Sequence, residues 1–203
     1  MINREIKMVE KAASFITDRI IAEKLISEDL RDWYIYSYLR IIETFISIGT
    51  VLTFSLFIGN TMPTVLFLLF FIALRSRTGG FHCNEFWQCY LVSNVVYIVI
   101  SLTEPYIRDY NVTMCVLTAI SSIVIFLVGT VNHPNISYDK EELIRSKTLA
   151  RSILGIELII MISMATIGID RIYISNLAIG IILCAILMLL AKVFKQEVKK
   201  DEN

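Results

Sequence analysis

Apolar residues occur in long runs from residue 41 onward, whereas residues 1–40 mix charged and apolar positions. Within that first segment, apolar residues recur at steps of three and four, the spacing that lines one face of a helix. The segment is therefore predicted to form an amphipathic helix on a membrane surface or against the rest of the chain. Its apolar face would carry Ile2, Ile6, Val9, Ala13, Ile16 and Ile20.

Six apolar blocks follow, and turn-forming residues and charges separate them. Apolar residues make up 56% of the chain, above the roughly 45–50% of soluble domains. The pattern predicts an all-α protein, a polytopic membrane helix bundle that forms one domain over residues 1–203, with a transmembrane bundle at 41–191 and a tail at 192–203. The blocks are residues 41–58, 63–74, 90–103, 112–131, 153–169 and 172–190.

Basic residues are distributed unevenly between the two sides that six spans would define. Seventeen of the nineteen Lys and Arg residues fall on the side of the N-terminus, and only Arg108 and Arg171 fall on the other. Because positive residues are retained in the cytoplasm, both termini are predicted to be cytoplasmic. The formal net charge is zero, so no global field indicates a nucleic-acid partner.

The second and third blocks are too short to cross a bilayer as α-helices. Residues 63–74 would cover about 18 Å and residues 90–103 about 21 Å of a hydrocarbon core roughly 30 Å thick. Either both helices extend into the polar segment between them, or that segment dips into the membrane between half-helices. In both cases residues 75–89 form a broken or re-entrant segment at the inner interface, where polar backbone requires protein or a wet cavity around it.

This polar segment holds the residues best suited to catalysis. His82 precedes Cys89 by seven residues, and a cysteine nucleophile needs a base such as histidine to form its thiolate. On one continuous helix the two would lie about 10.5 Å apart along the axis, too far for a hydrogen bond. The backbone must therefore bend between them, and Gly79 with Gly80 can supply a break. Glu85, three residues after His82, is a candidate to orient the imidazole.

Other interpretations of these residues stay open. His82 and Cys89 could pack or relay protons instead of forming a dyad, and a metal site with Cys83 would need further ligands. Neither a metal nor a cofactor is predicted. Cys115 and Cys184 stand among aliphatic residues and are expected to pack as small hydrophobes. His133 is predicted to be a solvated turn residue. The basic run from Lys192 to Lys200 is predicted to anchor the chain on the cytoplasmic side.

The segment from Arg75 to Cys89 resembles the AgrB family of bacterial quorum-sensing peptidases. Arg75, the paired glycines, His82 and Cys89 occur in the order and spacing of that family, and the six spans, the amphipathic start and the chain length agree with it. The resemblance implies that Cys89 is the nucleophile and His82 its base. It also implies that Arg75 and Gly80 occupy positions important to the active segment.

The same resemblance implies a function in the bacterial cytoplasmic membrane. The substrate would be an AgrD-like propeptide, whose acidic C-terminal tail is removed through an acyl-enzyme thioester and whose signal portion is closed into a thiolactone or lactone. A homodimer and contacts with membrane lipid are further expected partners. The alternatives are a small transporter or peptide exporter without protease activity, built on broken helices, and a structural or sensor subunit.

Overall fold

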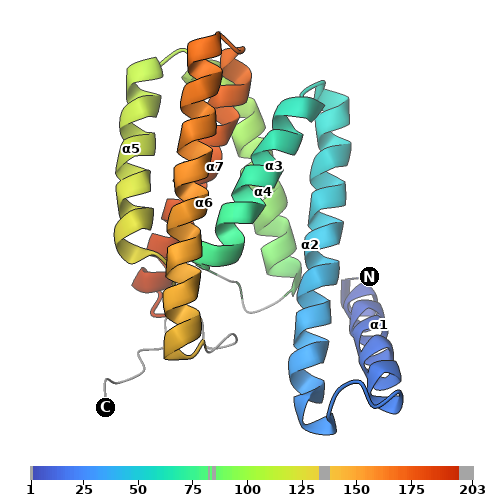
Figure 1. Cartoon of the computed structure of the whole chain (residues 1–203). Helices are drawn as coiled ribbons and strands as arrows, with labels where there is room; N and C mark the ends of the chain where they lie inside the picture. Colours follow the sequence, from blue (N-terminus) through green and yellow to red (C-terminus); the bar gives the residue numbers. More distant parts are fainter. Residues whose placement is uncertain (1, 82, 84–85, 133–137, 197–203) are drawn as a thin grey trace. The chain divides into compact units, whose positions relative to one another are not determined.

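The computed structural model describes residues 2–81, 83, 86–132 and 138–196. In these ranges the regular structure is entirely helical, which confirms the predicted fold class (Figure 1). A single turn of 3-10 helix, Glu28–Leu30, follows the first helix. The α-helices are α1 (Ile2–Ala22), α2 (Arg31–Ile58), α3 (Thr61–Thr78), α4 (Phe86–Ile107), α5 (Asn111–Val128), α6 (Lys140–Ile167) and α7 (Arg171–Val193).

Six helices of the described chain, α2 to α7, are long and apolar enough to cross a membrane, as the sequence predicted. The protein is therefore a multi-pass membrane protein. Large apolar side chains lie exposed on these helices, including Val116, Ile120 and Ile123 along α5. Exposed apolar surface of this kind is stable in lipid, where no hydrophobic effect opposes it.

The helices extend beyond the apolar blocks at several ends. The helix α2 begins at Arg31, ten residues before its block, and α3 and α4 each extend four residues into the polar segment between them. Polar residues continue these helices because every backbone group needs a hydrogen bond near the membrane. At 18 residues, α3 covers about 27 Å, close to a full span. Conversely, α5 stops at Val128 because Gly129 takes a positive φ of 73°.

The chain divides into two compact units, and the first joins Met1–Phe54 with Cys83–Tyr97. Side-chain contacts between its helices include an ion pair and a hydrogen bond. The Nε of Arg31, at the start of α2, lies 2.9 Å from Oδ1 of Asp18 on α1. The hydroxyls of Thr50 on α2 and Tyr90 on α4 lie 3.1 Å apart. Within the face predicted for α1, Ala13 is fully buried.

The second unit joins Ser55–His82 with Ile98–Asn203, and α7 is its central helix. This helix packs against α3, α5 and α6 (Figure 1). It is also the most buried of the six spans. Its side chains contribute most of the apolar core. The fully or nearly fully buried members of that core are Leu74, Ile125, Val131, Leu154, Ile181, Cys184, Ala185, Met188 and Ala191.

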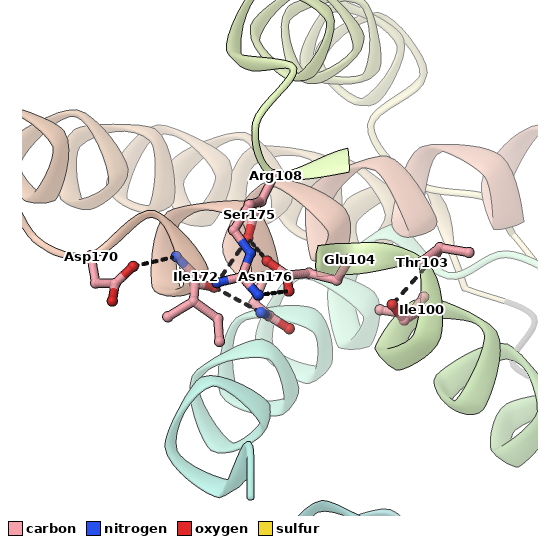
Figure 2. A network of polar contacts seen from close by, with 8 residues as sticks. All are labelled: Ile100, Thr103, Glu104, Arg108, Asp170, Ile172, Ser175 and Asn176. Carbon is pink, nitrogen blue, oxygen red and sulfur yellow. Dashed lines mark hydrogen bonds and ion pairs between the residues drawn. The ribbon is translucent and has the colours of Figure 1, made fainter. Parts of the chain in front are cut away.

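A buried polar network joins the end of α4 to the start of α7 within the second unit (Figure 2). Glu104 is 2% exposed, and one of its carboxylate oxygens accepts a hydrogen bond from the Ser175 hydroxyl. The other oxygen lies 3.2 Å from Nη2 of Arg108, one helical turn later. A buried carboxylate with both a hydrogen bond and an ion pair is stabilised against the cost of its desolvation.

Candidate functional site

The predicted break between the two catalytic candidates is present. The helix α3 ends at Thr78 and α4 begins at Phe86, so no continuous helix joins position 82 to position 89. Cys89 is the fourth residue of α4 and lies in its first turn. His82 and Glu85 lie outside the described residues, so their pairing with Cys89 stays a prediction.

Cys89 lies near the start of a helix and beside an apolar stretch of the chain. Its side chain is half-buried, and the adjacent Tyr90 meets Thr50 of α2. Thr50 stands nine residues into the apolar block 41–58, roughly 13 Å along the helix from the start of that block. The first turn of α4 therefore lies beside the middle of an apolar stretch.

Two glycines form the turn that leaves α3, and their backbone requires glycine. Gly79 has φ 64° and ψ −150°, and a Cβ atom there would lie 2.7 Å from the carbonyl oxygen of Val131. Gly80 has φ 131°, and its Cβ would lie 2.5 Å from Nη1 of Arg75. Since both positions combine unfavourable dihedrals with a close neighbour, the turn fits no larger residue.

Arg75 and α7 fix the residue that follows this turn. Nη2 of Arg75 donates to the Phe81 carbonyl at 2.8 Å, and the Phe81 N–H donates to the Leu187 carbonyl at 2.8 Å. The Phe81 ring lies 5.3 Å from the ring of Phe194, centroid to centroid. Phe81 is thus held by a guanidinium at its carbonyl, a helix carbonyl at its N–H and an aromatic contact at its ring. The predicted supporting residues Arg75, Gly79 and Gly80 meet in this one turn.

Residues far away in the sequence hold the end of α3 from the other side. The hydroxyls of Thr130 and Ser146 both donate to the Arg77 carbonyl, at 2.9 and 3.1 Å. The Val131 N–H donates to the Thr78 carbonyl at 2.9 Å. The last carbonyls of a helix have no partner within the helix, so these three donors satisfy groups that would otherwise lack one.

Sequence reasoning missed Thr130, Val131 and Ser146. The fourth apolar block was expected to run through Val131, which left no reason to separate these residues from a membrane span. The available signal was Gly129 followed by the polar Thr130, a pattern typical of a helix end.

The remaining cysteines have different environments. Cys184 is fully buried, as expected, and its thiol lies 3.7 Å from the Phe71 carbonyl. Cys115 is exposed on α5, so the expectation that it packs in the interior is wrong, and Cys83 is half-buried. Among the described residues, no group of three or more His, Cys, Asp or Glu side chains could hold a metal ion. His133 lies outside the described residues.

Comparison with known proteins gives one match. The model of the family AgrB, accessory gene regulator B, matches residues 13–194 of the 203. No curated protein and no solved structure matches. The match runs from α1 to the residue after α7, so it includes the turn after α3 and the start of α4.

Proposed function

The chain belongs to the accessory gene regulator B family, and we propose that it is a membrane-embedded cysteine endopeptidase that removes the C-terminal tail of its substrate. Family membership places the protein in quorum-sensing peptide processing and implies an AgrD-like propeptide as that substrate. The proposal adds the nucleophile, the base and the chemistry of ring closure.

Cys89 is proposed as the nucleophile and His82 as its base. The observation that carries this assignment is the break in the helix, which puts Cys89 in the first turn of α4 soon after an anchored turn. Position 82 is joined by one peptide bond to Phe81, whose N–H and carbonyl are both held. A base on an anchored segment can be presented repeatedly to the same thiol, as general-base catalysis requires.

The proposed reaction proceeds in two steps. The imidazole takes the Cys89 proton, the sulfur attacks the carbonyl carbon before the tail, and the peptide C–N bond breaks as the imidazolium protonates the leaving amine. A thioester now joins Cys89 to the signal portion. A thiol or hydroxyl in that same portion, deprotonated by the imidazole, then attacks the thioester. The bond to Cys89 breaks, the sulfur regains its proton, and the product is a thiolactone or lactone.

Water competes with ring closure at the second step. Exchange of one thioester for another is near balance, whereas hydrolysis of the thioester runs downhill. Excluding water and holding the internal thiol nearby therefore decides the product. The level of the Tyr90 to Thr50 contact, beside the middle of the apolar block 41–58, supports a site with little access to water.

Arg75, Gly79 and Gly80 are proposed to shape the turn rather than to touch the reacting atoms, and Glu85 to orient the imidazole. The Gly79 N–H donates to the Arg75 carbonyl at 3.2 Å, and the Arg75 guanidinium holds Phe81. The Gly79 N–H and Nη2 of Arg75 therefore already donate hydrogen bonds within the turn. This disfavours them as the donors that stabilise the negative oxygen formed when the sulfur attacks the carbonyl.

The decisive experiment co-expresses the protein with an AgrD-like propeptide and follows the peptide by mass spectrometry. Wild type is expected to yield a tail-less peptide with the mass of a closed ring, lighter by one water than the linear form. Cys89→Ala and His82→Ala should each abolish cleavage, while Cys115→Ala, a matched change at an exposed cysteine, should retain it.

Cleavage by the Cys89→Ala variant would contradict the proposal. Peptide that reaches the medium uncleaved in the presence of wild type would instead indicate the alternative, an exporter without protease activity. We further propose the bacterial cytoplasmic membrane with both termini inside, which reporter fusions at each terminus test. A homodimer is tested by cross-linking in the membrane.

A further inference from the structure

The geometry points to Thr130 and Ser146 as positioning residues for the active segment, an inference that rests on the proposed function. Both hydroxyls donate to one acceptor, the Arg77 carbonyl, although they lie 53 and 69 residues from it in sequence. Both are nearly inaccessible to solvent, with Thr130 2% and Ser146 3% exposed. The two residues come from different elements, the segment after α5 and the first turns of α6.

The Arg77 carbonyl stands where α3 gives way to the glycine turn. It is the second-last carbonyl of α3, so it accepts no hydrogen bond from within that helix. Two residues later the backbone takes the dihedrals of Gly79, and four residues later it reaches the anchored Phe81. Fixing this carbonyl therefore fixes the direction in which the chain leaves α3 toward position 82.

Val131, the residue after Thr130, also contacts the end of α3 and the glycine turn. The Val131 N–H donates to the Thr78 carbonyl at 2.9 Å, and the Val131 carbonyl lies so close to Gly79 that a Cβ there would be 2.7 Å away. The segment from Thr130 to Val131 thus contacts three successive residues of the turn. Removing its hydroxyl should loosen the turn without unfolding the helices, because α3 also packs against α7 and α6.

Sharing one acceptor predicts a particular kind of coupling. When one hydroxyl is removed, the other still donates to the Arg77 carbonyl, so each single variant should lose little activity. When both are removed, the carbonyl loses both of these side-chain donors. We expect kcat for propeptide cleavage to fall about threefold in Thr130→Val and in Ser146→Ala, and about thirtyfold in the double variant, more than the product of the single effects.

A matched control exists in α5. The Thr118 hydroxyl donates to the Met114 carbonyl at 2.7 Å and the Ser122 hydroxyl to the Thr118 carbonyl at 2.8 Å, all within one helix. The double variant Thr118→Val with Ser122→Ala makes the same chemical change away from the turn. It should leave kcat within about twofold of wild type, as is usual for changes that leave no carbonyl without its helical partner.

The experiment measures cleavage by the purified full-length protein in lipid vesicles, together with hydrogen exchange of the peptide that contains Gly79 and Phe81. In the Thr130 and Ser146 variants we expect kcat to fall while KM stays within about twofold of wild type. The conservative variants Thr130→Ser and Ser146→Thr, which keep a hydroxyl, should restore kcat. Exchange at the turn should rise in the double variant only, since the Gly79 and Phe81 amides are both hydrogen-bonded in the intact turn.

Two outcomes separate this inference from the proposed function. If wild type cleaves and Cys89→Ala does not, but the Thr130 and Ser146 double variant cleaves like the α5 control, the positioning role is wrong while the peptidase stands. If Cys89→Ala still cleaves, the peptidase assignment fails. Hydrogen exchange then decides the structural part by itself, and unchanged exchange at the turn in the double variant overturns it.

Discussion

Replacing Gly79 with alanine tests whether the turn after α3 requires glycine. Its φ of 64° with ψ of −150° lies in a region that only glycine adopts readily, so alanine costs about 2–3 kcal/mol in strain. The new Cβ would also lie 2.7 Å from the Val131 carbonyl, and moving that carbonyl endangers the bond from the Val131 N–H to Thr78, worth about 1 kcal/mol. The total is about 3–4 kcal/mol.

Gly168→Ala is the matched control for Gly79→Ala. Gly168 has φ 80° and ψ 29°, an ordinary left-handed helix cap, and a Cβ there would meet no atom within 4 Å. It should cost about 1 kcal/mol. In a thermal melt of the detergent-purified protein, we expect a midpoint about 10 °C below wild type for Gly79→Ala and about 3 °C below for Gly168→Ala. Equal melting of the two variants would refute the argument from the turn.

Two buried carboxyls of the second unit should respond oppositely to the same change. Glu104→Leu removes the acceptor of Ser175 and the partner of Arg108, so it should destabilise the protein by about 2–4 kcal/mol. Glu157 is 4% exposed, and neither of its carboxyl oxygens has a hydrogen-bond partner among the residues that the structure describes, so Glu157→Leu should stabilise the protein by about 1–3 kcal/mol. The midpoints of thermal melts of Glu104→Leu and Glu157→Leu, compared with wild type, test both predictions. A lower midpoint for Glu157→Leu would show that its carboxyl has a partner in the working protein.

Thr50→Val removes one side of the contact to the Tyr90 hydroxyl, which holds the first turn of α4 within its unit. In this variant the rate at which iodoacetamide alkylates Cys89 should differ from the wild-type rate by about twofold or more. The control is Thr53→Val, because the Thr53 hydroxyl donates to the Gly49 carbonyl of its own helix, and this variant should be alkylated at the wild-type rate. Equal alkylation rates in the two variants would show that the contact between Thr50 and Tyr90 does not affect the reactivity of Cys89.

The membrane architecture could be predicted because apolar blocks of span length leave few alternatives. Six spans and a helical break between positions 82 and 89 are confirmed. The helix ends were less predictable, since α3 and α4 continue through polar residues that hydropathy assigns to loops. In a membrane, backbone hydrogen bonding rather than side-chain polarity decides where a helix stops.

The active segment could be predicted only in part. Arg75, Gly79 and Gly80 stand close together in sequence, so their common role in one turn was accessible. Thr130 and Ser146 were not, because their contact with Arg77 joins residues more than fifty positions apart. Hydropathy likewise passed over Glu157 within the fifth block, since its burial depends on which face α6 turns toward its neighbours.

The anchored turn after α3 suits the proposed two-step reaction. A base must take a proton in the first attack, protonate the leaving group and then act again on the incoming thiol, so it must return to one place through both steps. Arg75 and Leu187 hold Phe81 from opposite ends of its backbone, while Thr130 and Ser146 hold Arg77. These contacts hold the backbone at residues 77 and 81, so they fix the course of the chain as far as Phe81. For the proposed dyad, spaced by seven residues, distant residues rather than the short sequence of the turn therefore supply the fixed backbone that ends at Phe81.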